Sequence, residues 1–288
     1  VDEAVSIAEV YQDTGSASQI SQMILLASMI KDGQTEAFLY FVKNASEITP
    51  ILKDLLSAWI LMGLDDELNA NRIFDKTAKV QGMEQFANFH RAMSQLAAGK
   101  VDQAQRTFDL IHSDQASPTR RSVIYHTKIL LSQSKFKEAQ QLLEKWFGPT
   151  FDPEIEELYI NAANEKAYPT SLFPKTDIAV ADVFHSIANL VSKEADPTFT
   201  LIYSRLAQYL DRNHVDSTLM TADLLVELGQ YDLAIKEHEK LSAIHPQFFA
   251  SELGRAEALR SSGKEMAAIE VLVELTRCLL YTSDAADE

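Results

Sequence analysis

Small and apolar residues recur along the last third of the chain at a constant step, which leads from Ala188 to Ala222 and then to Ala256. Further columns share this step, and they are Val191, Leu225 and Leu259; Ala195, Gly229 and Gly263; Thr200, Ala234 and Ala268; Ala207, Leu241 and Leu275; and Arg212 with Pro246. A period of about 34 residues is typical of repeat proteins. Several columns that keep one period without a gap predict such a protein, in which each unit packs on the next.

Each unit of this repeat is predicted to be a pair of helices. Leu219, Ala222 and Leu225 follow one another at helical spacing and would form the inner face of a first helix. Gly229 then ends this helix, because glycine readily adopts the left-handed conformation found after many helices. A second helix would finish before Pro246, which cannot continue one. Stacking of the next pair would cover the apolar side that each pair leaves open.

The same pattern continues toward the N-terminus with more drift. It predicts helix pairs near residues 17–48, 50–80, 85–117 and 120–149, and a lone second helix at 2–12. Between 150 and 178 the pattern lapses, and prolines bracket a short helix near 154–164. We therefore expect an N-terminal block of divergent pairs at 1–149, a degenerate unit or hinge at 150–178, and a C-terminal block of three units at 179–277.

The segments 221–235 and 252–269 resemble tetratricopeptide repeats, with a small residue in the first helix, an alanine opening the second and Pro246 after it. The resemblance implies an all-α fold, a right-handed α-α superhelix built as a solenoid of antiparallel helix pairs. The segments 119–124, 201–205 and 214–216 add a resemblance to a group of bacterial tetratricopeptide-repeat proteins typical of alphaproteobacteria. Members of that group look exported, which implies a periplasmic location, with the cytoplasm as the alternative.

Both ends of the chain look cut. It begins at Val1 with no targeting segment, and the pattern starts in the middle of a unit. Residues 278–288 break the expected helical pattern and resemble the translated read-through of a sequencing adapter, so we expect a non-native tail there. The sequence is thus interpreted as an internal piece of a longer protein.

Charge and composition narrow the choice of partner. The net charge of −16 disfavours nucleic acid, because phosphate binding depends on clustered Lys and Arg. No apolar run reaches the roughly 18 residues that suggest a membrane span. The single cysteine, Cys278, excludes an intrachain disulfide and a cysteine metal cluster.

No motif for catalysis, metal or cofactor binding is complete, so we expect no enzyme activity and no cofactor. His238-Glu239 starts like a zinc-protease helix, but Ser242 stands where the second histidine is required. His238 is instead expected to pack between helices. Gly99-Lys100 lacks the earlier glycine of a phosphate-binding loop and is explained by the end of a helix.

The repeat register predicts which side chains face the concave surface, where repeat proteins bind their partners. The expected groove residues of the C-terminal block are His185, Asn189, Asp223, Glu227, Glu257 and Arg260. In the middle units, Phe86 and Phe89 form an apolar strip with Met93 and Leu96, which could be an exposed peptide site or simply core. Beside this strip, Arg121 and Lys128 would form a basic edge together with Arg120. This edge either selects an acidic partner segment or balances neighbouring carboxylates.

The leading functional hypothesis is an adaptor or scaffold that binds a peptide or protein partner on the concave face. Two alternatives remain open: a helper domain within a larger enzyme, and an architectural spacer that stacks end to end.

Overall fold

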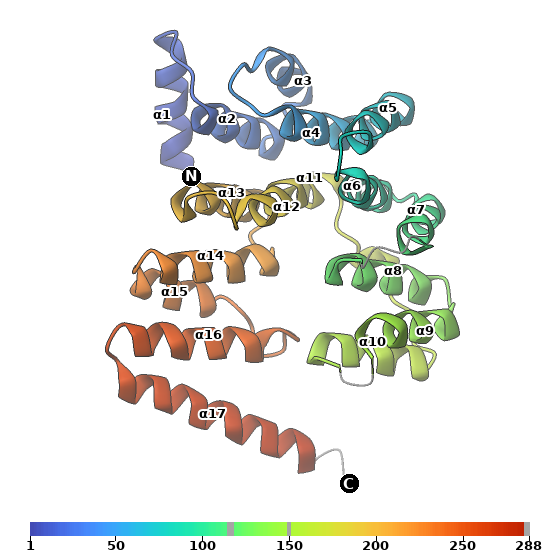
Figure 1. Cartoon of the computed structure of the whole chain (residues 1–288), viewed down its shortest axis with the longest axis vertical. Coiled ribbons are helices and arrows are strands. Elements are labelled where there is room, and N and C mark those ends of the chain that lie inside the picture. Colours follow the sequence, from blue (N-terminus) through green and yellow to red (C-terminus); the bar gives the residue numbers. More distant parts are fainter. Residues whose placement is uncertain (114–117, 149–150, 285–288) are drawn as a thin grey trace. The chain divides into compact units, whose positions relative to one another are not determined.

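The computed structural model describes residues 1–113, 118–148 and 151–284, with side chains up to residue 277, and the regular structure in these ranges is helical throughout (Figure 1). The described chain divides into two compact units. Unit 1 comprises Val1–Phe184 with Tyr209–Asp211, and unit 2 comprises His185–Gln208 with the residues from Arg212 onward.

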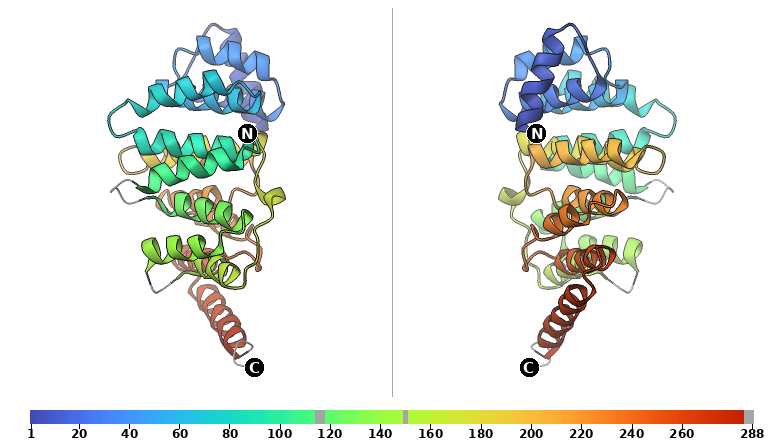
Figure 2. Two further views of the ribbon diagram at one scale, coloured as in Figure 1. Left: turned by 90° about the vertical axis from the view of Figure 1, so that its right-hand side faces the viewer. Right: turned by 90° about the vertical axis from the view of Figure 1, so that its left-hand side faces the viewer.

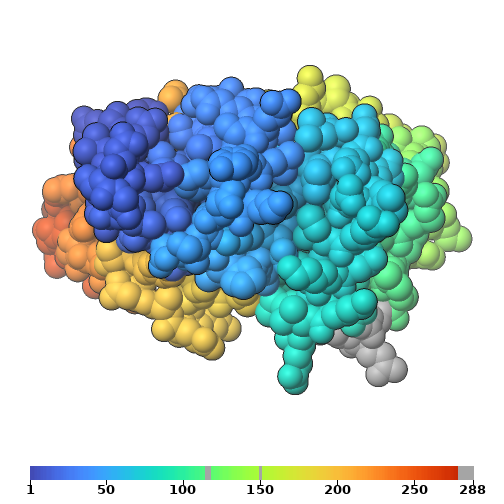
Figure 3. Space-filling model, turned by 90° about the horizontal axis from the view of Figure 1, so that it is seen from above, coloured from blue at the N-terminus to red at the C-terminus, as the bar shows by residue number. Residues whose placement is uncertain are grey.

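Unit 1 begins with a single helix, continues with helix pairs, and ends with shorter elements. Its elements are α1 (Asp2–Asp13); α2 (Gln19–Lys31) with α3 (Thr35–Asn44); α4 (Pro50–Gly63) with α5 (Glu67–Ala78); α6 (Glu84–Ala97) with α7 (Val101–Ser113); α8 (Arg120–Ser132) with α9 (Phe136–Phe147); α10 (Pro153–Ala163); a 3-10 turn (Thr170–Leu172); and α11 (Thr176–Ala179). The pairs predicted from the sequence are confirmed for the described residues. Figure 2 shows α4 to α10 in successive layers, and Figure 3 shows a face of the unit on which the N-terminal helices form one continuous surface.

Unit 2 preserves the constant step of the repeat. Its helices are α12 (Ala181–Val191) with α13 (Pro197–Leu210), both of which share residues with unit 1, then α14 (Val215–Glu227) with α15 (Tyr231–His238), and α16 (Phe248–Ser261) with α17 (Glu265–Asp284). The second helices start at Pro197, Tyr231 and Glu265, so each begins one full step after the previous one. The helix pairs and their period confirm the predicted all-α fold class.

Most turns between paired helices contain a left-handed residue. Gly229 and Gly263 supply it in unit 2, with φ of 71° and 82°. In unit 1, Asp65 and Ser134 take the same role with φ of 61° and 59°. Gly33 and Gly99 keep the glycine in the other two pairs of unit 1, with φ of 67° and 76°. Residues with a Cβ adopt this conformation at a cost of about 1–2 kcal/mol, so Asp65 and Ser134 keep the turn geometry at some cost in stability.

The core lies between the two helices of each pair and between successive pairs. Ala222 and Ala234 are fully buried, so the small residues predicted for the close helix contact lie where expected. The largest side chains that are fully buried in unit 1 include Trp59, Phe74 and Phe108. No helix in the described ranges combines the length and apolarity that crossing a membrane requires.

The two parts of the proline-rich segment 150–178 pack against different helices of unit 1. Its first part, α10, packs against α8 and α9 and so continues the stack of unit 1. The chain then turns back, and α11 packs against α4 and α6, far away in the sequence. The whole segment belongs to unit 1, so the division between the units does not fall there. The role of this segment as a hinge stays a prediction.

The end of the chain corrects one expectation. The helical pattern was expected to stop before Cys278, but α17 continues to Asp284. The segment 278–284 contains no proline or glycine, and Leu279 and Leu280 are good helix formers, so the preceding helix can continue through it. Residues 285–288 lie outside the described residues, and the foreign origin of the tail stays a prediction.

Candidate partner-binding surface

The predicted polar column of unit 2 lies at the surface. Asn189 on α12, Asp223 on α14 and Glu257 on α16 are all exposed, and each occupies the same position of its repeat. Equivalent positions of stacked first helices point to the same side of a repeat array. The three side chains therefore offer polar groups to a partner on one face of these helices.

Glu257 is already neutralised within its own helix. Arg260 contacts it in a two-pronged ion pair, with Nε 2.9 Å from Oε2 and Nη2 2.5 Å from Oε1. These hydrogen bonds from Arg260 lower the pKa of Glu257. At this position the surface is polar but carries little net charge.

Asp223 and Glu227 differ from Glu257 because neither has a counter-ion or hydrogen-bond partner within the described residues. Both are exposed, and they lie four residues apart on the same side of α14. Like charges at this spacing repel each other and weaken a helix. The two carboxylates are therefore free to pair with cationic groups from outside the chain.

Apolar side chains accompany the carboxylates. Leu219 on α14 is half-buried, and Leu253 on α16, the helix that packs beside α14, is 55% exposed. Leu190 on α12 is exposed as well. The surface thus combines free negative charge with apolar area that a partner could cover.

His185 does not belong to this surface, and the prediction that it faces the groove is wrong. It is only 3% exposed. Its Nδ1 lies 3.1 Å from Ser217 Oγ and its Nε2 lies 2.8 Å from the Asn189 amide nitrogen. Because α12 and α14 pack together over the ring, which also lies against His214, the histidine is a packing residue.

The aromatic strip of unit 1 is mostly core. Met93 and Leu96 are buried, while Phe86 and Phe89 are half-buried. Both phenylalanines pack edge-on against the buried His90, with ring centroids 4.8 Å and 5.5 Å away. Met93 and Leu96 therefore belong to the core and not to an exposed peptide site. Phe86 and Phe89 are only partly accessible to solvent.

The chain itself returns to α6, the helix that carries this strip. Helix α11 packs against α4 and α6, and Thr176 sits so close to Gly63 that a Cβ there would lie 2.8 Å from its Cγ2. The residues that follow, Val180 and Phe184, are fully buried. Sequence periodicity carries no information about such a return of the chain.

The predicted basic edge is paired with carboxylates. Arg120 binds Glu154 at 2.9 Å, and Lys128 lies 3.6 Å from the same side chain. Arg121 forms an ion pair with the buried Asp182. Of the two alternatives for this edge, the contacts favour the balancing of neighbouring carboxylates over the selection of an acidic partner.

The described residues contain no group of three or more His, Cys, Asp or Glu that could hold a metal ion. His238 is 2% exposed, and its Nδ1 lies 3.1 Å from Ser251 Oγ, so its predicted packing role is confirmed.

Three buried histidines of unit 1 escaped the sequence analysis. His90 is fully buried, and neither ring nitrogen has a partner within the described residues. His112 and His126 contact each other through their Nδ1 atoms at 2.8 Å. Their position in the repeat register indicates that they face neighbouring helices, but their pairing depends on how α7 meets α8.

No family model matches the chain, and no curated protein matches it. Among solved structures, it is similar to the crystal structure of the P58(IPK) TPR domain, with 16% sequence identity over 91% of this chain and 84% of that chain and a TM-score of 0.27.

The helices of the chain itself define its class. Over the described residues it is an all-α repeat protein of antiparallel helix pairs, and most of the turns within these pairs contain a left-handed residue. In unit 2 the pairs recur with the period of about 34 residues that is typical of tetratricopeptide repeats.

Proposed function

We propose that this chain is a non-catalytic protein-interaction scaffold, which binds a peptide or protein partner on the exposed face of α12, α14 and α16. The observation that carries the proposal is the pair of carboxylates on α14, Asp223 and Glu227, which are exposed and have no counter-ion in the described chain. This free pair lies beside the half-buried Leu219 and the exposed Leu253.

The chemistry of the face favours a partner segment with cationic and apolar side chains. Carboxylates attract Lys and Arg, and the exposed part of Leu253 contributes about 25 cal/mol for each Å² that a partner covers. A segment that combines cationic and apolar side chains satisfies both. Because exposed charges are screened over a distance of about 8 Å at physiological ionic strength, the affinity for this partner is expected to fall with added salt.

The test begins with peptides selected by the whole chain from a displayed random library. We expect enrichment of segments that combine Lys or Arg with apolar residues. Titration calorimetry then compares the selected peptide with wild type and with the Asp223→Lys/Glu227→Lys variant. Reversal of both charges is expected to weaken binding at least tenfold, which corresponds to about 1.4 kcal/mol.

Glu270→Lys is the matched control, because Glu270 is an exposed carboxylate of unit 2 that lies on α17. This variant changes the charge without touching the proposed face and should bind like wild type. Circular dichroism checks that every variant keeps its helices. Equal affinity for wild type and the α14 variant would assign the selected peptides to another surface.

An architectural role is the second candidate, and α17 favours it. Met266, Ile269, Leu272 and Val273 form an exposed apolar stripe along this helix, with Met266 78% exposed. A second copy of the chain could cover this stripe as the next helix pair would. Sedimentation equilibrium decides this point, since the mass should rise with concentration in wild type and not in Met266→Glu/Ile269→Glu.

A further inference from the structure

Helix α17 differs from the second helices before it, because no helix pair follows it within the described residues (Figure 1). In the earlier pairs of unit 2, the next first helix covers the second helix. Ser204 on α13 is fully buried, and its Oγ lies 2.7 Å from Thr221 Oγ1 on α14. His238 on α15 is buried in the same way against Ser251 on α16. One repeat step further, Leu272 on α17 is 42% exposed.

A second column of the repeat shows the same change. Leu201 on α13 packs against the core of unit 2, and Ile235 on α15 is buried. The equivalent residue on α17 is Ile269, which is 52% exposed. The apolar stripe of α17 therefore includes two positions that a following first helix covers in the earlier pairs. The shape that fits these positions is that of a helix.

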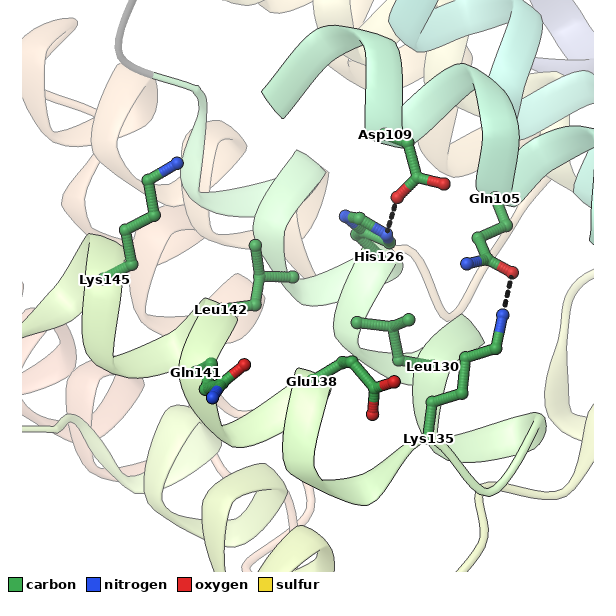
Figure 4. Close-up of a pocket in the computed structure, with 9 residues that line it drawn as sticks. All are labelled: Gln105, Asp109, His126, Leu130, Lys135, Glu138, Gln141, Leu142 and Lys145. Atoms are coloured by element: carbon green, nitrogen blue, oxygen red, sulfur yellow. Dashed lines mark hydrogen bonds and ion pairs between the residues drawn. The ribbon is translucent and has the colours of Figure 1, made fainter. Parts of the chain in front are cut away.

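The edges of three junctions between helix pairs share a lysine contact. Each lysine directly follows the left-handed residue after a first helix, and it contacts the second helix of the preceding pair. The contacts are Lys100 with Glu67 at 2.5 Å, Lys135 with Gln105 at 2.7 Å, and Lys264 with Asp232 at 2.6 Å. Figure 4 shows the second of them, in which the Lys135 ammonium donates to the Gln105 side chain on α7. At these junctions the covering helix is thus followed by a cation that meets the helix it covers.

Glu265 offers a partner for such a cation on α17. It is the first residue of this helix, as Glu67 is the first residue of α5. Its side chain is exposed and has no ion pair within the described chain. Glu270 adds another exposed carboxylate to the same helix. The stripe and its carboxylates together fit an amphipathic helix with a cation after its C-terminal end.

A second copy of the chain matches this chemistry less well. Its first helix, α1, also exposes apolar side chains, Ile7 and Val10. The same helix carries the exposed Asp2, Glu3 and Glu9. Like charges that are brought together across an interface oppose binding. Charge therefore favours a cationic helix from another protein over α1 of a second copy.

We propose that α17 is a second docking surface, which binds an amphipathic helix of another protein in the position that α16 takes on α15. The apolar side of this helix covers Ile269 and Leu272, and a lysine or arginine after its C-terminal end pairs with Glu265. Leu272 has no polar atom at the point where His238 meets the hydroxyl of Ser251, so the docked helix carries an apolar side chain there. This surface shares no residue with the exposed face of α12, α14 and α16.

A synthetic peptide that copies a covering helix of this chain tests the proposal. The fluorescently labelled probe has the sequence of residues 248–264 with Ser251→Ala, and anisotropy measures its binding to the whole chain. Wild type is expected to bind this probe. A second probe with Lys264→Glu should bind about threefold more weakly, which is the effect of one exposed ion pair. Glu265→Lys in the protein should invert the preference between the two probes.

Variants of the stripe identify the surface that binds. Ile269→Asp/Leu272→Asp should weaken binding of the first probe roughly tenfold or more, because two apolar contacts are lost. Ile244→Asp is the matched control, since Ile244 is a 93% exposed apolar residue of unit 2 outside α17, and it should bind like wild type. Circular dichroism checks that each variant keeps its helices.

Four results would each overturn the proposal. They are the absence of binding to wild type, equal affinity for the two probes, unchanged affinity in Ile269→Asp/Leu272→Asp, and a wild-type mass that rises with concentration in sedimentation equilibrium. The last result would assign the stripe to a second copy and so to the architectural role. The comparison of the two probes with wild type remains decisive if a variant fails to fold.

Discussion

Replacement of Gly254 by alanine tests the packing of unit 2 most directly. Gly254 lies in the interior of α16, and a Cβ on it would lie 2.4 Å from Cε1 and 2.7 Å from Nε2 of His238. The imidazole is buried and held by Ser251 and therefore has little room to move. Replacement of an exposed glycine inside a helix by alanine usually stabilises the protein. A loss of stability in Gly254→Ala would therefore indicate a clash with His238.

The expected magnitude follows from two opposing effects. Alanine is favoured over glycine in a helix interior by about 1 kcal/mol. Carbon atoms in good contact lie about 3.5–4.0 Å apart, so the Cβ would overlap deeply with the ring of His238. Overpacking typically costs about 1–3 kcal/mol, and so close a contact belongs in the upper part of that range. Gly254→Ala should therefore destabilise the protein by about 1–2 kcal/mol.

A double-mutant cycle isolates the contact. Urea unfolding monitored by circular dichroism gives the free energy of unfolding of wild type, Gly254→Ala, His238→Ala and the double variant. Once the imidazole is removed, the same Gly254→Ala change should stabilise by about 1 kcal/mol, because only helix propensity remains. A gain of stability in the wild-type background, or the same effect in both backgrounds, would refute the reasoning.

Two further predictions concern unit 1 and the turns. Burial lowers the pKa of His90 and His112 to about 3 and that of His126 to about 4. As the pH falls, these histidines therefore take up protons in the unfolded chain before they do so in the folded one. The stability that is present above pH 6.5 should be lost as the pH falls toward 4. His90→Leu should raise the urea midpoint at neutral pH and reduce this acid dependence, because it removes two unpaired buried nitrogens; a lower midpoint would contradict this account. Gly229→Ala should cost about 1–2 kcal/mol in the same assay, since φ is 71° at this turn, and an unchanged midpoint would show that the turn can adjust.

The helix pairs could be predicted because their signals are local. Apolar spacing marks the buried side of each helix, and glycine or proline marks its end. The register between Ala222 and Ala256 therefore located α14 and α16. The turn at Asp65 shows the limit, because its left-handed conformation appears without the glycine that usually announces it.

The candidate surface could be predicted only in part. Exposure of Asp223 and Glu257 followed from their place on the helix, about 100° around it from the buried Ala222 and Ala256. The charge that each side chain offers to a partner could not be predicted in this way, because it depends on whether a neighbour such as Arg260 neutralises it. His185 occupies an equivalent helical face, yet it is buried because α14 packs over it.

The sequence by itself determined the helices, their pairing and their period, since these follow from residues close together in the chain. Only the tertiary structure decided which side chains meet. Arg121 and Asp182 are 61 residues apart and form an ion pair, and His112 finds His126 across two helices. Such contacts depend on how helix pairs stack and where the chain returns, and no local periodicity encodes either.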